Sequence, residues 1–468
     1  MLNIFKNVLC QGYNQIIAGD VIMEKTDFFG ALRAAASLTL YRNITLDPAC
    51  RAWFNFVESV VKGKPADEIL PMYSELFFRL AQLTDPAEGS FTGDAWQDHL
   101  LTLLLYDDNA FSRGASLYPP EELGPGLLDA ARGDLVRLQA MFRIDGAAAR
   151  AAVIDRLGAG GIPCGGLPLW QGLAAPAGLR AGTSSAGGII DLLSQSTGWD
   201  SCLADLACYY RAAGAGPYGR YRAFRWSGAA GRLEGIAGPD PIRFTDLIGY
   251  QDQRRQVVEN TEKFLAGFPA NNLLLYGDRG TGKSSTVKAL LNQYGEQGLR
   301  LVEVPKGSLG DFPQIIAMLR QQPQRFIIYM DDLSFEESEV EYKELKAVLE
   351  GGLTARPHNV LIYATSNRRH LVRERFSDRD TGDELHSNDT VQEKLSLADR
   401  FGVTIFFTTP DKALYLKIVR ELAGQAGLAL GSSELERRAL LWASWHNGLS
   451  GRTARQFIEN LSGELHLS

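Results

Sequence analysis

The most constraining feature of this sequence is a glycine-rich segment between an apolar run and a helical run. Residues 277–284 read Gly-Asp-Arg-Gly-Thr-Gly-Lys-Ser, directly after the apolar residues 272–276 and before the helical pattern of 285–292. This is the strand–GxxxxGK[ST]–helix pattern of a phosphate-binding P-loop. Its glycines let successive backbone N–H groups point at phosphate oxygens, and the positive end of the helix assists them. The alternative, a chance match in a glycine-rich turn, is disfavoured by the flanking strand and helix.

Two residues of the loop carry specific expectations. We expect Lys283, taken as an exposed loop cation, to reach the β- and γ-phosphates of ATP, and the Ser284 hydroxyl to ligate Mg²⁺. The whole expected nucleotide-binding stretch consists of Gly277, Asp278, Arg279, Gly280, Thr281, Gly282, Lys283, Ser284 and Ser285.

A metal-holding acid is expected at the end of a second apolar run. Residues 326–330 are apolar and lead into Asp331 and Asp332. Asp331 is suited to hold Mg²⁺ through water, and Asp332 to orient or deprotonate the attacking water. The Asp332 side chain is one methylene shorter than that of a glutamate, which leaves its carboxylate further from the water, so Glu336 is an alternative base. The competing interpretation is a buried strand that ends in a solvated acidic turn.

Composition restricts the function classes. The 468 residues are 45% hydrophobic and 22% charged, which excludes a disordered, collagenous or disulfide-scaffold protein. The net charge of −7 means that any nucleic-acid contact must be local, and it favours a protein as partner. The five cysteines form no CxxC pair, and no histidine has a cysteine or second histidine at metal-ligand spacing, so we expect reduced thiols and no zinc site.

The sequence also predicts no membrane insertion. Its longest uncharged stretch, residues 157–179, has the length of a membrane helix but is interrupted by glycines and prolines. The N-terminal residues lack the small residues of a signal cleavage site. We therefore expect a cytoplasmic protein.

Four further motifs surround the P-loop, and their order matters more than any single match. They are Phe244–Gln251, the apolar run Asn359–Asn367, the run Leu397–Gly402 (Leu-Ala-Asp-Arg-Phe-Gly) and the run Ser450–Phe457. Together with the P-loop and the acidic pair, they resemble the AAA+ ATPase superfamily from residue 244 to the end. More narrowly, residues 331–335 and 393–402 are similar to a bacterial group of predicted AAA+ ATPases that is labelled only as a domain of unknown function. That group implies ATP chemistry and names no substrate.

The resemblance implies roles around the nucleotide. Ile248 and Gly249 would contact adenine. Asn367, or alternatively Ser366, would face the γ-phosphate and the attacking water, whereas a strand cap is the simpler interpretation of Asn367.

The resemblance also implies roles for two arginines. Arg400 would be the arginine finger supplied to a neighbouring subunit, unless it only pairs with Asp399 at the surface. Arg455 would reach back to the nucleotide from a late helix that also carries Arg452, unless that helix simply faces solvent.

The implied fold is an α/β P-loop NTPase whose parallel sheet has the AAA+ strand order 5-1-4-3-2. We expect four parts: a mainly α-helical N-terminal region at 1–157, a Gly/Ala/Pro-rich connecting region at 158–241, the AAA+ nucleotide-binding domain at 242–410 and a C-terminal helical lid at 411–468. An arginine- and aromatic-rich run at 218–226 either stacks nucleotide bases or forms a strand or hairpin. The net acidity favours the second interpretation, with the aromatic side chains packed inward and the arginines facing water.

The leading functional hypothesis is an oligomeric Mg²⁺-dependent ATPase. It would couple ATP hydrolysis to the remodelling or loading of an unidentified macromolecular partner. The short segment 306–310 after the second strand leaves little room for a pore loop, which disfavours a protein-threading unfoldase. The main alternative is an ATP-dependent regulatory binding module with very slow hydrolysis. A small-molecule kinase is disfavoured because no acceptor site is visible.

Overall fold

The structure of the chain is a computed structural model that divides into two compact units, residues 1–220 and 221–468. The described residues are 16–18, 21–23, 25–84, 90–158, 166–173, 185–334, 344–346, 348–349, 357–367, 400–428, 430–446 and 448–467. Each unit is described by itself.

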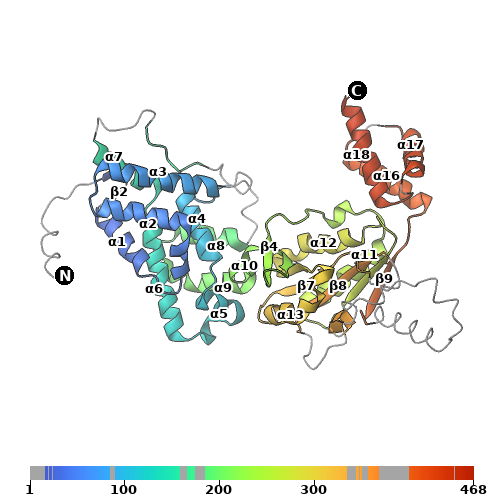
Figure 1. The fold of residues 1–468 in the computed structure, drawn as a ribbon, viewed down its shortest axis with the longest axis horizontal. Helices are drawn as coiled ribbons and strands as arrows, with labels where there is room; N and C mark the ends of the chain where they lie inside the picture. The colour runs from blue at the N-terminus through green and yellow to red at the C-terminus, as the bar shows by residue number, and fades with distance from the viewer. Residues whose placement is uncertain are drawn as a thin grey trace. The chain divides into compact units, whose positions relative to one another are not determined.

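The first unit is mainly helical (Figure 1). Its elements are β1 (Ile16–Ala18), β2 (Val21–Met23), α1 (Lys25–Ala36), α2 (Pro48–Val61), α3 (Ala66–Leu83), α4 (Ala95–Leu105), α5 (Ala110–Leu117), α6 (Pro125–Phe142), α7 (Gly146–Leu157), α8 (Ser185–Gln195), α9 (Leu203–Ala213) and α10 (Gly216–Arg220). Apolar residues at helical spacing fill one continuous core, in which the rings of Trp53 and Trp96 stack at a centroid distance of 4.8 Å.

One cluster in this unit joins residues that are far apart in the sequence. The sequence spacing indicated no histidine near a cysteine, but the fold brings His99 of α4 to Asp47 and Cys50 at the start of α2, with ligand atoms all within 4.8 Å of one another. His99 Nε2 lies 2.8 Å from Asp47 Oδ1, and the same oxygen accepts the backbone N–H groups of Ala49 and Cys50. The group is therefore explained as a histidine-supported helix N-cap.

The second unit is built on a seven-stranded sheet with the order β4-β3-β6-β7-β8-β5-β9. Its strands are β3 (Ala223–Ser227), β4 (Arg232–Ile236), β5 (Leu273–Gly277), β6 (Leu299–Glu303), β7 (Arg325–Met330), β8 (Val360–Ser366) and β9 (Val403–Phe407). All neighbouring pairs are parallel except β3 and β4. The whole sheet does not match the expected order 5-1-4-3-2, because the preceding hairpin extends it at the β6 edge.

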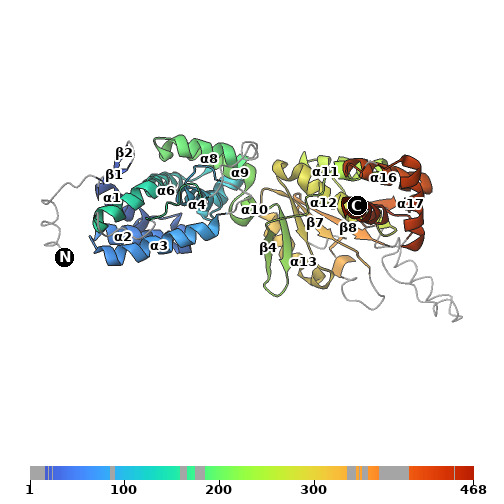
Figure 2. The same cartoon turned by 90° about the horizontal axis from the view of Figure 1, so that it is seen from above.

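Helices cover both faces of this sheet, as parallel sheets require. Helices α11 (Gln251–Leu265) and α12 (Lys283–Tyr294) lie on one face and α13 (Phe312–Arg320) on the other (Figure 2). The strands are short apolar runs, and β8 is buried along its full length. The carboxyl ends of β5, β7 and β8 therefore meet at one edge of the sheet, where their polar flanking residues come together.

Residues 223–226 of the arginine- and aromatic-rich run lie in the first strand of the added hairpin, whereas residues 218–220 belong to α10. Phe224 and Trp226 are buried, whereas Arg225 is exposed and pairs with Glu303 of β6 at 2.9 Å. Trp226 Nε1 donates to Asp311 Oδ2 at 2.7 Å. The prediction of a strand or hairpin with inward aromatic side chains is therefore confirmed for residues 223–226 and wrong for residues 218–220, which are helical.

The last three helices form a cluster of their own, which we call the C-terminal bundle: α16 (Lys412–Gln425), α17 (Ser432–Trp445) and α18 (Gly451–Leu467). Their buried residues include Tyr415, Val419, Ala439 and Leu461. Among the residues that the structure describes, no helix combines the length and the apolar character needed to cross a membrane.

Candidate nucleotide-binding site

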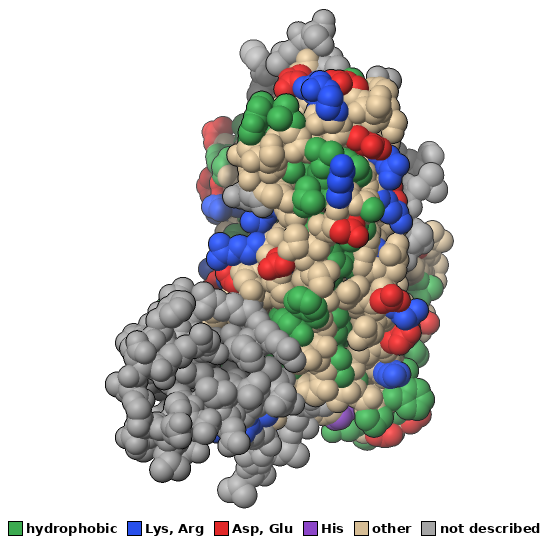
Figure 3. All heavy atoms as spheres, turned by 90° about the vertical axis from the view of Figure 1, so that its right-hand side faces the viewer, with side chains coloured by type: hydrophobic (Ala, Val, Ile, Leu, Met, Phe, Trp, Pro, Cys, Tyr) green, Lys and Arg blue, Asp and Glu red, His purple; other side chains and the backbone are tan. Residues whose placement is uncertain are grey.

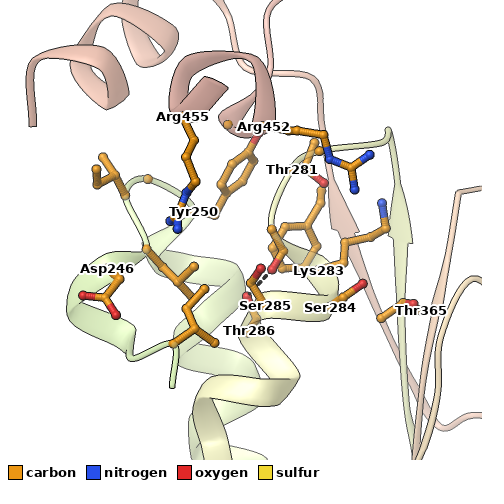
Figure 4. Close-up of a pocket in the computed structure, with 18 of the residues that line it drawn as sticks. Asp246, Tyr250, Thr281, Lys283, Ser284, Ser285, Thr286, Thr365, Arg452 and Arg455 are labelled. Atoms are coloured by element: carbon orange, nitrogen blue, oxygen red, sulfur yellow. Dashed lines mark hydrogen bonds between the residues drawn. The ribbon is translucent and has the colours of Figure 1, made fainter. Parts of the chain in front are cut away.

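A cavity of about 810 Å³ opens at the edge where β5, β7 and β8 end (Figure 4). It lies between the P-loop, the segment before α11 and the C-terminal bundle, and its size suits a small-molecule ligand. The expected site residues that line it are Ile248, Gly249, Arg279, Gly280, Thr281, Gly282, Lys283, Ser284, Ser285, Asp331, Asp332, Asn367 and Arg455.

The P-loop backbone places three glycines, Gly277, Gly280 and Gly282, at positive φ angles. Gly277 has φ +130°, and a Cβ there would lie 2.0 Å from the carbonyl oxygen of Phe407 on the neighbouring strand. Gly282 has φ +92° and forms the N-cap of α12. L-residues rarely adopt such angles, so these glycines let the chain turn sharply and aim the first N–H groups of α12 into the cavity.

Lys283 is buried, contrary to the expectation of an exposed loop cation. Only 6% of the residue is accessible, and its Nζ donates to the carbonyl oxygens of Gly277 and Asp278, each at 2.7 Å. A third bond goes to Asn367 Oδ1 at 3.3 Å. Desolvation by burial lowers the pKa of the Lys283 ammonium to about 8. Within the described ranges, no carboxylate forms an ion pair with this ammonium, although Asp278, Asp332 and Asp331 lie near enough to raise its pKa.

The donor set for a magnesium ion is assembled beside Lys283. Ser284 Oγ donates to Asp331 Oδ1 at 2.6 Å, and Thr365 Oγ1 donates to the same oxygen at 2.5 Å. Although burial desolvates the carboxylate, these hydrogen bonds hold the pKa of Asp331 below its ordinary value. The buried hydroxyl of Tyr329, on the strand that leads to Asp331, has no hydrogen-bond partner in the described part of the chain. A serine hydroxyl and an ionised carboxylate are the hard oxygen ligands that Mg²⁺ prefers, so these residues fit the ion.

Asp332 adopts a left-handed backbone conformation, with φ +50°, which non-glycine residues rarely do. Its N–H donates to Thr365 Oγ1 at 3.0 Å, and its Oδ1 accepts from Asn367 Nδ2 at 2.5 Å. Asn367 therefore contacts both Lys283 and Asp332, one with each end of its amide. Ser366, the alternative to Asn367, is fully buried and does not line the cavity.

Apolar side chains also line the cavity. Ile248 and Gly249 face Ile418 and Leu422 of α16, and Ile248 packs against the core of the C-terminal bundle. Sequence reasoning missed Ile418 and Leu422, although their i, i+4 spacing places both on one face of a helix.

Two arginines of α18 line the cavity, although only Arg455 was expected to. In Figure 4, the Arg452 side chain extends toward Lys283, whereas Arg455 extends toward the segment of Asp246 and Tyr250. The Arg452 N–H donates to the carbonyl oxygen of Gly280 at 3.3 Å, so the start of α18 touches the P-loop directly. Their i, i+3 spacing is a signal that could have identified both.

Some of the predicted site residues do not line the cavity. Gly277 and Asp278 shape the loop without lining the cavity, and Asp278 Oδ2 accepts from the N–H of Thr409 at 3.2 Å. Arg400 stands just before β9 and does not line the cavity of its own chain. The alternative base Glu336 and the alternative Arg400 partner Asp399 lie outside the described residues.

Comparison with known proteins identifies the family of this chain but no activity. Residues 219–465 match the model of a family described as protein of unknown function (DUF815), and no curated protein sequence matches.

Solved structures with some likeness include the RuvB Holliday junction branch migration motor of Thermotoga maritima, with 15% identity over 48% of this chain and a TM-score of 0.35. The chain spans 66% of that protein. Another is a FIGL-1 AAA domain in complex with ADP, with 16% identity, 48% of this chain and 74% of that chain covered, and a TM-score of 0.34. At these TM-scores we draw no inference from either likeness.

The lowered pKa of Lys283 generates a pH prediction. A phosphate ligand needs the charged ammonium, which the free protein loses as the pH rises through about 8. Affinity for magnesium tripolyphosphate should therefore fall by up to ~10-fold per pH unit above that value, and binding at pH 9 should take up close to one proton. Calorimetric titration in two buffers of different ionisation enthalpy measures this uptake.

Lys283→Arg is the control, because its side chain stays charged. Binding at pH 9 without proton uptake would contradict the assignment.

Proposed function

We propose, from the premise that this chain belongs to the family described as protein of unknown function (DUF815), that it is an AAA+ ATPase. In this proposal it binds Mg²⁺–ATP in the P-loop cavity, hydrolyses it, and uses the cycle to remodel or load a macromolecular partner in the cytoplasm. The five parallel strands after the hairpin lie in the spatial order β9-β5-β8-β7-β6, which is fifth, first, fourth, third and second along the chain. This order supports the AAA+ assignment.

One observation carries the proposal: a buried lysine, a serine–aspartate pair and a second aspartate line the same cavity at the carboxyl ends of the strands. Among the described residues, the hydrogen bonds of Lys283 Nζ all go to carbonyl and amide oxygens, so a triphosphate would supply a directly bound negative charge. Ser284 Oγ and Asp331 Oδ1 are 2.6 Å apart, and these two side chains would hold Mg²⁺. The ion would neutralise negative charge on the phosphate oxygens.

Hydrolysis then depends on the hydrogen bonds around Asp332. Asn367 donates to Asp332 and accepts from Lys283, so it fixes the carboxylate beside the phosphate-binding ammonium. In this arrangement Asp332 orients the attacking water and accepts its proton, while Asn367 keeps its position. The C-terminal bundle would serve as a lid over the nucleotide. It would bring Arg452 to the phosphates and Arg455 to the end of the cavity that holds the adenine base.

A neighbouring subunit would complete the site. Arg400 does not line the cavity of its own chain, although its motif resembles that of an arginine finger. A finger acting in trans stabilises charge on the transferred phosphoryl group. This supports a homo-oligomer as the active form.

The partner that best fits the surface is a protein. On the face drawn in Figure 3, Lys and Arg side chains of the described residues lie interspersed with Asp and Glu side chains rather than in one basic stripe. Together with the net charge of −7, this disfavours a nucleic-acid track. In this proposal the helical first unit recruits the protein partner.

The short Asp332 side chain favours one alternative, an ATP-dependent regulatory switch. The carboxylate is already held by Asn367 at 2.5 Å, and it is one methylene shorter than a glutamate, so hydrolysis could be very slow. ATP turnover measured against protein concentration separates the two. A steep rise with assembly supports the oligomeric ATPase, and tight binding without turnover supports the switch.

Lys283→Ala tests nucleotide binding most simply. It should weaken Mg²⁺–ATP binding on the order of 100-fold, because it removes the charged hydrogen bonds to the phosphates. Lys263→Ala is the control, since Lys263 on α11 is exposed and does not line the cavity. Since Lys283 is buried, thermal unfolding must verify that both variants are folded. Unchanged ATP affinity in folded Lys283→Ala protein would refute the site.

Asp332→Asn separates hydrolysis from binding. This variant should bind Mg²⁺–ATP within about 3-fold of the native affinity but hydrolyse it ~10²-fold more slowly, the usual scale for loss of a general base. Asp331→Asn should instead raise the Mg²⁺ concentration required. Phosphate release and nucleotide binding measured side by side provide the readout. A larger rate loss in Glu336→Gln would move the base to that residue.

Arg400→Ala tests whether the site is shared between subunits. It should bind ATP with near-native affinity and lose most turnover, because the finger acts only on the neighbour's phosphates. Mixing it with inactive Lys283→Ala under subunit exchange should restore part of the activity, since some interfaces then combine an intact P-loop with an intact Arg400. Absence of recovery despite proven exchange would refute the shared site.

A further inference from the structure

Tyr329 carries a buried phenol beside the residues that fit Mg²⁺. It lies on β7, two residues before Asp331, and only 2% of the residue is accessible. Its ring belongs to the same core cluster as Val287 and Leu290 of α12. The hydroxyl is a buried polar atom for which the described part of the chain provides no hydrogen-bond partner. A buried donor of this kind costs free energy, so its presence needs an explanation.

The strand register brings this phenol to the acidic end of β7. Residues two apart on a strand point to the same face and lie ~6.6 Å apart, which a tyrosine leaning along the strand can span. Tyr329 pairs with Tyr363 of β8. Two residues further along each strand, Thr365 Oγ1 donates to Asp331 Oδ1 at 2.5 Å. These four side chains therefore share one face of the sheet.

The phenol and the Asp331 carboxylate influence each other. Burial raises the pKa of Tyr329 far above its ordinary value, and the Asp331 charge raises it further, so the hydroxyl stays a neutral donor. Although burial opposes it, the hydroxyls of Ser284, Thr365 and Tyr329 hold the pKa of the carboxylate below its ordinary value. The two groups are thus close neighbours, yet the phenol completes no hydrogen bond with any described residue.

Three donors already occupy Asp331 Oδ1. It accepts from Ser284 Oγ at 2.6 Å, from Thr365 Oγ1 at 2.5 Å and from the backbone N–H of Asp332 at 3.2 Å. Of these donors, the Ser284 hydroxyl is the one that is also expected to ligate Mg²⁺. When it does, the carboxylate can take a new donor, and a hydrogen bond to an ionised group is among the strong ones.

We propose that Tyr329 is a positioning residue for the metal site: its hydroxyl, which no described residue bonds in the free protein, donates to Asp331 when Ser284 ligates Mg²⁺. This inference rests on the proposed function, because it concerns the metal end of the same cavity. The phenol then keeps the carboxylate in place while the serine hydroxyl serves the ion. Hydrogen-bonded partners behind a ligand raise metal affinity in this way.

Tyr329→Phe removes the hydroxyl and leaves the ring, so two opposite effects should result. In the free full-length protein, the thermal unfolding midpoint should stay level or rise by about 2–4 °C, because an unsatisfied donor is gone. The Mg²⁺ concentration that half-saturates ATP binding should rise on the order of 10-fold. ATP affinity in EDTA should stay within about 2-fold, because Lys283 binds the phosphates independently of this hydroxyl.

Tyr363→Phe is the matched control. Tyr363 lies beside Tyr329 in the register of the sheet, but its hydroxyl is bonded to Asn260 Nδ2 and Thr261 Oγ1, both at 2.9 Å. This variant should lower the unfolding midpoint by about 2–4 °C and leave the Mg²⁺ requirement unchanged. A role of Tyr329 in the core alone would give both variants the same pattern.

A double-mutant cycle with Asp331→Asn tests which group the phenol serves. Asp331→Asn alone should raise the Mg²⁺ requirement. Adding Tyr329→Phe should then raise it by less than about 2-fold more, because the carboxylate that the hydroxyl holds is gone. A full further rise of ~10-fold would refute Asp331 as the partner.

Three further outcomes would overturn the inference. A Tyr329→Phe protein with the native Mg²⁺ requirement shows that the phenol does not position Asp331. A drop in unfolding midpoint like that of Tyr363→Phe, or a failure to fold, shows that the hydroxyl is already bonded in the free protein. Native protein that binds ATP equally well with and without Mg²⁺ removes the metal site and leaves the P-loop, whereas native protein that binds no ATP removes the proposed function as well.

Discussion

The proposed nucleotide site of the second unit depends on one buried cation, the Lys283 ammonium, which forms no ion pair with any residue that the structure describes. Lys283 is bonded to two P-loop carbonyls and to Asn367, and its burial lowers the pKa of its ammonium to about 8. The glycines of the loop permit this geometry, and the parallel strands bring Asp331 and Asn367 to the same edge. A polyphosphate would complete the charge balance, which is why the rest of the cavity is best understood around that ligand.

The sequence was sufficient to predict the local parts of this site. A P-loop is a contiguous segment in which each glycine, the lysine and the serine have fixed positions, so it can be recognised without knowing the fold. The apolar strands before Asp331 and Asn367 could be predicted for the same reason, because burial on both faces leaves a continuous apolar run. Lys283 was predicted as a phosphate ligand from its position in the motif, but its burial was not foreseen, because burial depends on carbonyls that only the folded loop directs at it.

Features that depend on distant segments could not be predicted in this way. The hairpin β3–β4 joins the sheet through β6, whose sequence carries no sign of the added strand. Arg254 contacts carbonyls that lie five to ten residues before it, and nothing in a helix-start arginine distinguishes that role from solvent exposure. His99 meets Cys50 only because α4 packs near the start of α2. These contacts arise from tertiary packing, which no local pattern encodes.

The central claim is that this cavity binds a magnesium–nucleotide complex through the P-loop. A crystal structure of the full-length protein with Mg²⁺ and a non-hydrolysable ATP analogue tests it most directly. The account predicts the triphosphate on the N-terminus of α12 with Lys283 on its terminal phosphates. It also predicts that the direct Ser284–Asp331 hydrogen bond of 2.6 Å is replaced by Mg²⁺ held between the two side chains. Nucleotide bound elsewhere, or a filled cavity in which Ser284 and Asp331 keep their direct bond and Lys283 keeps its carbonyl partners, would contradict it.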